Sequence, residues 1–276
     1  MALTKVLIAV KTYPSLSTKY DELVCTAGFR EDGSWIRIYP VPFRKLDYDK
    51  QYPKWAWIEL DLDRNTRDLR SESYRPHDID EEIRILEQIG TGPEGWRRRK
   101  QIALHSVWTN MSDLIAASKV EPIYTSLAVL KPREILRFEW EETAREWDKE
   151  KLDAIYARQQ EFNLFEETKK IFKVARKVPY KFFYVFTTDD GIERRLMIED
   201  WEIGMLYWNT VKRADGDEVI ACQKVKERYF DDFSKRKDLY LFLGTSLSYH
   251  LRSKNPFMII GVFPPPILPP EEPTLF

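Results

Sequence analysis

The residues best suited to chemistry lie in the segment DRNTRDLRSESYRP, residues 63–76. Proteins bind phosphate and carboxylate with guanidinium groups, hydroxyls and backbone amides, and loops carried by a rigid sheet often hold function. We therefore interpret this segment as a candidate phosphate-binding loop. Its acidic residues leave a second interpretation open, in which the arginines form the ion pairs of a connecting loop. The candidate binding residues are Arg64, Arg67, Arg70 and Arg75.

Two other charged groups could contribute to the same chemistry. Asp61 and Asp63 lie two residues apart on a predicted strand, so their carboxylates share a face. Together with a nearby arginine they could hold a magnesium ion and a phosphate, and solvated surface charge is the alternative. The basic cluster GWRRRK has no interleaved acidic residue and adds Arg97, Arg98, Arg99 and Lys100.

An aromatic face accompanies these charges. In the predicted strand WIRIYPVPFR, residues 35–44, Ile36 and Ile38 share one side and larger residues share the other. KWAWIELDLD, residues 54–63, repeats this arrangement. Aromatic rings beside a guanidinium could stack nucleic-acid bases. Alternatively, a helix or a second domain covers the face and makes it a buried interface. Its residues are Trp35, Arg37, Tyr39, Trp55 and Trp57.

Other catalytic signatures are absent from the sequence. The ten glycines form neither G-x-G-x-x-G nor G-x-x-x-x-G-K, and there is no G-x-S-x-G motif. Cys25 and Cys222 are far apart and each lies in an apolar segment, which predicts two buried thiols. None of the three histidines lies at ligand spacing from another histidine or a cysteine. We therefore predict no structural zinc site and no cofactor.

Composition limits the partners and the location. The net charge of −1 provides no general attraction for nucleic acid, so such a partner would need a local basic patch. The longest apolar run, PFMIIGVF, is much shorter than the roughly 20 residues of a membrane helix. The N-terminal segment resembles a first buried strand more than a signal peptide. We expect a cytoplasmic protein without a membrane partner.

The elements that position these groups predict an α+β fold. Residues 1–140 form a β-rich unit whose sheet is mixed or antiparallel and could close into a barrel. The same unit has two short helices, one at 78–90 and one from Ser112. Residues 141–170 form a charged helical connection. Residues 171–263 form a second unit of one hairpin, two helices and two strands, and 264–276 form an exposed proline-rich tail. Turns are predicted at Asp32-Gly33 and Asp190-Gly191.

The terminal EEPTLF, residues 271–276, resembles the short peptides with which bacterial DNA-replication and repair proteins dock on the β sliding clamp. Leu275 and Phe276 match the leucine–phenylalanine pair of those peptides, whereas Glu272 replaces their usual glutamine. The resemblance implies a protein partner that binds the tail.

Together these features predict a non-catalytic nucleic-acid-binding or accessory protein. The aromatic face would stack bases, and the two arginine clusters would hold phosphates. One alternative is an enzyme that acts on a nucleotide or nucleic-acid phosphate through Asp61, Asp63 and the arginine-rich loop. The other is a protein–protein adaptor whose aromatic face is a buried interface.

Overall fold

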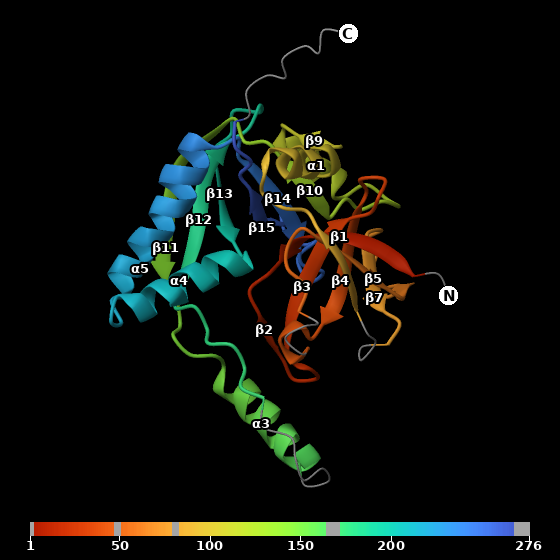
Figure 1. The fold of residues 1–276 in the computed structure, drawn as a ribbon, viewed down its shortest axis with the longest axis vertical. Coiled ribbons are helices and arrows are strands. Elements are labelled where there is room, and N and C mark those ends of the chain that lie inside the picture. The colour runs from red at the N-terminus through yellow and green to blue at the C-terminus, as the bar shows by residue number, and fades with distance from the viewer. Residues whose placement is uncertain (1–2, 47–50, 79–82, 164–171, 268–276) are drawn as a thin grey trace.

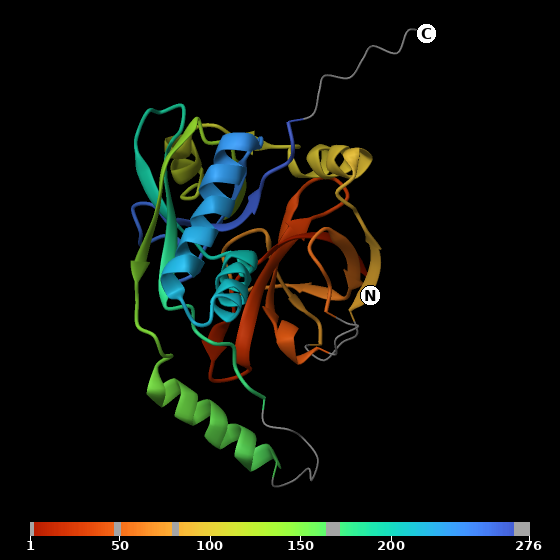
Figure 2. The same cartoon turned by 60° about the vertical axis from the view of Figure 1, so that its left-hand side comes forward.

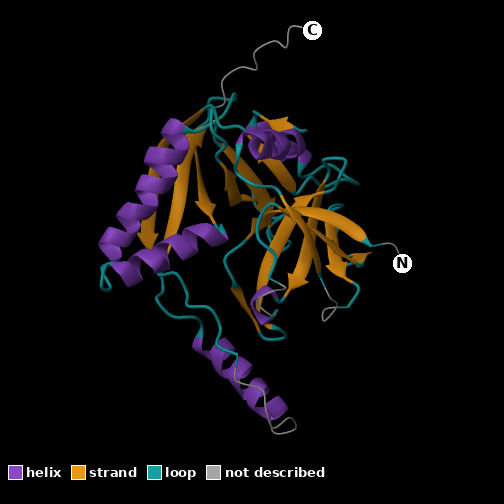
Figure 3. Cartoon of the chain, in the orientation of Figure 1, coloured by secondary structure: helices purple, strands orange, loops and turns teal. Residues whose placement is uncertain are grey.

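Two β-sheets build the protein, and the first takes its strands from the N-terminal part of the chain (Figure 1). The computed structural model describes residues 3–46, 51–78, 83–163 and 172–267. Strands dominate the N-terminal side of the molecule, whereas most of the helical ribbon flanks the second sheet (Figure 3). The predicted α+β class with a β-rich N-terminal unit is confirmed.

The first sheet is a curled half-barrel in which β1 is an interior strand between β3 and β5. It has the order β6-β7-β4-β3-β1-β5-β8, with β2 paired to β3. Strand β1 is apolar on both faces, as expected for a strand that is covered on both sides. The strands are β1 Thr4–Lys11, β2 Ser15–Ser17, β3 Asp21–Phe29, β4 Trp35–Val41, β5 Ala56–Leu60, β6 Leu62–Arg64, β7 Ser73–Pro76 and β8 Arg84–Gln88.

The second sheet is mixed and has the order β11-β12-β13-β15-β14-β10-β9. Most of its neighbours are antiparallel, and β13–β15 and β10–β9 are parallel pairs. The strands are β9 Val107–Trp108, β10 Leu127–Leu130, β11 Glu134–Glu142, β12 Tyr180–Thr187, β13 Arg194–Ile198, β14 Tyr240–Thr245 and β15 Phe257–Phe263.

The helices lie around the sheets, and two of them cover one side of the second sheet (Figure 2). These two are α4 Trp201–Arg213, which is capped by Asp200, and α5 Glu218–Lys226, which continues as a π-helix over Glu227–Ser234. α3, Lys149–Asn163, projects from the body of the protein (Figure 1). Within the described part of the chain, no helix combines the length and apolarity needed to cross a bilayer. The remaining helices are η1 Phe43–Lys45, α1 Pro93–Ala103 and α2 Met111–Ala117.

Both predicted turns occur where glycine is required. Gly33 joins β3 to β4 with a φ of 79°, and Gly191 lies between β12 and β13 with a φ of 71°. Glycine adopts such left-handed conformations without steric penalty. The predicted helix that starts near Ser112 is also present as α2, capped by Asn110. Cys25 and Cys222 are free thiols, as predicted, although only Cys222 is fully buried.

The predicted helix at residues 78–90 is wrong where the structure describes that segment. Residues 84–88 form strand β8, which pairs with β5 in the register Ile58↔Ile85. The side chains of Ile83 and Ile85 pack inside the half-barrel, so sheet pairing outweighs the helical spacing of the apolar residues. The helix lies one segment later, where α1 carries the basic cluster GWRRRK.

The division between the two units also differs from the prediction. A boundary at residue 140 would cut the second sheet, because β10 pairs with β14 and β11 pairs with β12. The strands of the first sheet end at residue 88, and those of the second begin at residue 107. The helix α3 therefore connects two strands of one sheet. Leu275 and Phe276 of the predicted docking tail lie outside the described residues.

One apolar core is shared by both sheets. Leu7 and Trp55 of the first unit and Phe242, Ile260 and Phe263 of the second belong to the same buried cluster. Two further clusters lie inside the half-barrel and between the second sheet and its helices. The two units are therefore packed as one body.

Candidate anion-binding cleft

The aromatic face of the first sheet is covered by the second sheet. Trp55 and Trp57 are 8% and 7% exposed, and the Trp35 ring lies 5.5 Å from that of Phe242. The prediction that these rings face solvent is wrong, and the alternative in which another part of the same chain covers the face is correct. Of this face only Tyr39 is clearly exposed. The other rings are occupied by the protein's own interior.

Arg37 and Arg70 hold the two units together. Arg37 donates to Ser126 Oγ at 2.8 Å, and Arg70 donates to the Thr245 carbonyl at 2.6 Å. Asp68 accepts from Arg70 Nε at 2.8 Å, which neutralises this buried guanidinium. Both arginines are fully engaged in the interior, so neither is available to a phosphate, contrary to prediction.

The rest of the arginine-rich segment is a connecting loop. Arg64 donates to the carbonyls of Ser73 and Arg70, at 2.6 Å and 2.9 Å, and so ties the loop to itself. Arg67 is exposed, and Arg75 lies 3.6 Å from Asp63. Among the residues that the structure describes, no group of three acidic, histidine or cysteine side chains could hold a metal ion. Of the predicted pair Asp61 and Asp63, Asp63 contacts Arg75 and also lies 3.2 Å from His77 Nδ1.

The second basic cluster is divided by the geometry of α1. Arg98 forms an ion pair with Glu87, and Lys100 forms one with Asp238 at 3.0 Å. Arg97 is exposed, whereas Arg99 points inward and is only 5% exposed. Four consecutive helical residues point in different directions, so the cluster does not act as one patch.

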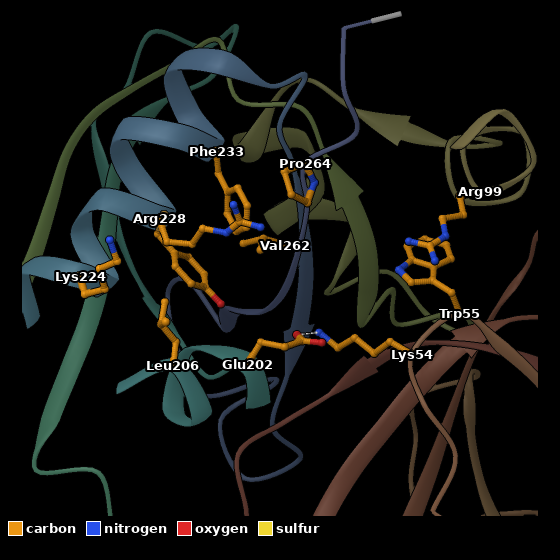
Figure 4. A pocket seen from close by; sticks show the side chains of 11 residues that line it. Lys54, Trp55, Arg99, Glu202, Leu206, Lys224, Arg228, Phe233, Val262 and Pro264 are labelled. Carbon is orange, nitrogen blue, oxygen red and sulfur yellow. Dashed lines mark hydrogen bonds and ion pairs between the residues drawn. The ribbon is translucent and has the colours of Figure 1, made fainter. Parts of the chain in front are cut away.

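Arg99 lines a cleft of about 410 Å³ between the two units (Figure 4). Its walls come from the segment before β5, from α1, α4 and α5, from the π-helix and from the end of β15. In Figure 4, Trp55 and Arg99 lie on one side, Arg228 and Phe233 on the other, and the ion pair of Lys54 and Glu202 lies below. The lining residues are Lys54, Trp55, Arg99, Glu202, Leu206, Lys224, Arg228, Tyr229, Phe233, Val262 and Pro264.

Arg99 is a buried cation without a neutralising carboxylate. Its guanidinium carbon lies 4.8 Å from the ring centroid of Trp55 and 5.0 Å from that of Trp96, and its Nε donates to the Ile89 carbonyl at 3.1 Å. No acidic side chain in the described part of the chain forms an ion pair with it. Burial lowers the pKa of Arg99 to about 10, so it stays charged at neutral pH. A buried charge of this kind is unfavourable unless an anion compensates it.

The backbone at Trp55, which lines the same cleft, is strained. Trp55 has a φ of 65°, which is rare for a bulky residue and is favoured only when the surroundings enforce it. Two backbone hydrogen bonds hold it: its N–H donates to Ile8 at 2.6 Å, and its carbonyl accepts from Ile89 at 2.8 Å. Such residues concentrate at functional sites. Here the strain places Lys54 and Trp55 in the cleft wall.

At the floor of the cleft Lys54 pairs with two carboxyl groups, of which Glu202 lines the cleft and Asp200 is buried outside its lining. Lys54 Nζ lies 2.7 Å from Asp200 Oδ1 and also pairs with Glu202. Complete burial raises the pKa of Asp200 well above its usual value. Burial acts in the same direction on Glu202, but the charge of Lys54 outweighs it and lowers the pKa of Glu202. The two carboxyl groups therefore differ in their affinity for a proton.

The opposite wall is cationic and aromatic. Lys224 and Arg228 pair with the neighbouring acids Glu227 and Asp232, at 2.7 Å and 2.6 Å, and so lie at a partly neutralised rim. The Arg228 guanidinium lies 4.6 Å from the ring centroid of Phe233. These residues come from α5 and its π-helical continuation, and π-helical turns are frequent at functional sites.

Only two of the predicted binding residues, Trp55 and Arg99, meet in this cleft. Three lining cations were not among the predicted binding residues, because they lie on separate elements and carry no shared motif: Lys54, Lys224 and Arg228. The one available signal in the sequence was local, because Lys54 immediately precedes Trp55.

Two family models match the chain. A domain of unknown function (DUF8758) covers residues 2–105, and a second domain of unknown function (DUF8757) covers residues 107–276. Their junction coincides with the division between the two sheets. No curated protein and no solved structure matches the chain.

Proposed function

We propose that this chain, which belongs to the family of the domain of unknown function DUF8757, binds nucleic acid by holding a phosphate and its adjoining base in the cleft between its two units. One observation carries the proposal. Arg99 is a buried guanidinium that lines the cleft and has no carboxylate partner among the described residues. A phosphate would provide the missing negative charge.

The composition of the cleft favours a nucleotide over a simple anion. Cationic groups and apolar or aromatic groups line the same space, which matches a ligand with a charged end and a flat apolar end. The volume of about 410 Å³ falls in the range of sites that enclose one small molecule. A single-stranded end or an unpaired nucleotide fits such a space, whereas a continuous duplex is too wide.

Fluorescence titration with single-stranded DNA and RNA, a duplex of the same sequence and free mononucleotides tests the proposal. Single strands should bind at low salt and weaken as salt rises, because phosphate contacts release counterions. Failure of single strands and mononucleotides to bind at low salt would overturn the proposal, since the electrostatic contribution is largest there.

Variants locate the binding to the cleft. Arg99→Gln should weaken binding of every phosphate-bearing ligand, but Arg99 also bonds Ile89 and could affect folding. The double variant Lys224→Gln/Arg228→Gln removes two rim charges without touching the core, because both residues are exposed. Its matched control is Lys226→Gln/Arg236→Gln, which removes equal charge from residues outside the cleft. The rim variant should lose affinity and the control should not; equal losses would place the binding elsewhere.

One observation favours a second candidate function, an enzyme that acts on a nucleotide phosphate. The carboxyl groups of Asp200 and Glu202 have pKa values shifted in opposite directions beside the same lysine, as in acid–base pairs. This site would replace the one predicted at Asp61 and Asp63. Incubation with nucleotides and oligonucleotides, with and without magnesium, followed by chromatography tests it. Turnover that Glu202→Gln abolishes would support catalysis. If the substrate stays unchanged, the catalytic function is refuted and only the binding function remains.

A further inference from the structure

A second concave surface, of about 250 Å³, lies outside the cleft, between the start of α3 and the extended segment 173–179. We call it the α3 groove. We propose that the α3 groove binds the backbone of single-stranded nucleic acid and so provides a second contact for the ligand of the cleft. This inference rests on the proposed function. Its lining includes the rings of Trp147, Tyr156 and Trp208, the cations Arg145, Lys173, Arg176 and Lys177, and the acids Glu146 and Glu218.

Three cations of the α3 groove have no carboxylate partner in the part of the chain that the structure describes. They are Lys173, Arg176 and Lys177, which lie within five consecutive residues. Arg145, which also lines the α3 groove, shows the contrast, because it forms two hydrogen bonds with Glu218, at 2.8 Å and 3.0 Å. Three unneutralised like charges repel one another, and an anionic polymer would relieve that repulsion.

The backbone that carries these cations is held in place. The Ala175 carbonyl accepts from Trp147 Nε1 at 2.7 Å, and the Ala175 N–H donates to Glu22 at 2.7 Å. The Arg176 carbonyl accepts from the Tyr13 hydroxyl at 2.7 Å. The cations therefore extend from a fixed segment, which reduces the conformational entropy lost when a ligand binds.

Aromatic rings lie beside the cations and select the type of polyanion. The Arg176 guanidinium carbon lies 3.7 Å from the ring centroid of Trp208, and Lys177 Nζ lies 5.9 Å from that of Trp147. Grooves that bind single strands combine a cationic track for phosphates with rings on which bases stack. An acidic peptide would use the same charges but would gain little from the rings. We therefore assign the α3 groove to single-stranded nucleic acid.

The test compares two oligonucleotides, of about 4 and about 16 nucleotides, over a range of salt concentrations. The variant is Lys173→Gln/Arg176→Gln/Lys177→Gln, and its matched control is Lys212→Gln/Arg213→Gln/Lys254→Gln, three exposed cations outside the α3 groove. If each lysine or arginine contacts one phosphate, the variant should reduce the slope of log K against log salt by about 2 for the longer strand. That slope corresponds to about a 20-fold smaller affinity change between 50 and 200 mM salt. The control should keep the wild-type slope.

Each outcome decides between the two sites. Equal slopes for the variant and the control would refute nucleic-acid binding in the α3 groove, whatever the result for the cleft. If the groove variant weakens the longer strand while Lys224→Gln/Arg228→Gln leaves both strands unaffected, the groove holds and the cleft fails. Polyglutamate that competes as well as an oligonucleotide of equal charge would reassign the α3 groove to acidic proteins. Because the altered side chains are at the surface, a urea unfolding curve should match wild type within about 0.5 kcal/mol, and Arg176→Gln alone provides a milder variant.

Discussion

Gly204 in α4 provides a direct test of how the two units pack. A Cβ atom built on Gly204 would lie 2.2 Å from Cδ2 and 2.4 Å from Cε2 of Tyr13, a residue that follows β1 of the first sheet. The Tyr13 ring is held at its far end, because its hydroxyl donates to the Arg176 carbonyl at 2.7 Å and accepts from Trp208 at 3.1 Å. The change Gly204→Ala therefore forces two fixed groups together.

Two opposing contributions set the expected size of the effect. Forcing a methyl group into a packed interior costs about 1–3 kcal/mol, and this overlap belongs at the upper end. Alanine is favoured over glycine inside a helix by about 1 kcal/mol. The variant Gly204→Ala should therefore lose about 2 kcal/mol of unfolding free energy. For a chain of this size the melting temperature should fall by about 4–8 °C.

A double-mutant cycle read by urea denaturation isolates the contact. With Tyr13→Ala in place, the same Gly204→Ala change should stabilise the protein by up to about 1 kcal/mol, because only the helix propensity remains. The coupling between the two sites should therefore be about 3 kcal/mol. If Gly204→Ala stabilises the wild-type protein, or if its cost persists without the tyrosine ring, the proposed packing of α4 against Tyr13 is wrong.

Three other predictions concern buried charges, and each is measured by urea unfolding. Arg37→Met should lower the unfolding free energy by about 1–3 kcal/mol, because it leaves the buried Ser126 Oγ without its donor. Burial acts to raise the pKa of Asp68, but hydrogen bonds from Arg70 and Ser73 lower it to about 2. Ionised Asp68 therefore stabilises the fold above about pH 4, and wild type should lose this contribution of about 2–3 kcal/mol as the pH falls from 4 to 2. The variant Asp68→Asn should lack this pH-dependent contribution. Burial lowers the pKa of Lys11 to about 8. The folded protein should therefore gain about 3 kcal/mol as pH rises from about 8 to 10.4, a gain that Lys11→Met abolishes.

Local chemistry explains which parts of the fold the sequence predicts. The turns at Gly33 and Gly191 were predictable because their positive φ angles are set within a few residues. The close approach at Gly204 is different, because its neighbour, the Tyr13 ring, comes from a distant part of the chain. Residues 83–89 were not predictable in this way, because their apolar spacing fits a helix and only the pairing of β8 with β5 decides for a strand.

The candidate site shows the same limit more strongly. The sequence identifies tryptophans and arginines on the first unit but cannot show that β14 and β15 cover them. In the sequence, Arg99 is one of four equivalent members of a basic cluster. Only the rotation of α1 in the structure places its side chain against Trp55. Lys224 and Arg228 reach the cleft only because α5 packs on the second sheet. Convergence of distant segments depends on tertiary packing, which no local pattern encodes.

The interior shared by the two sheets determines how the protein can be taken apart. A break near residue 106 would cut no strand, yet it would separate Trp55 from Phe263, whose ring centroids lie 5.0 Å apart. Each fragment alone would expose an apolar surface to solvent and would tend to aggregate. Produced together, the fragments could recombine and restore the fold. In this respect the two units of the single chain resemble the two subunits of a heterodimer that are joined by a peptide linker.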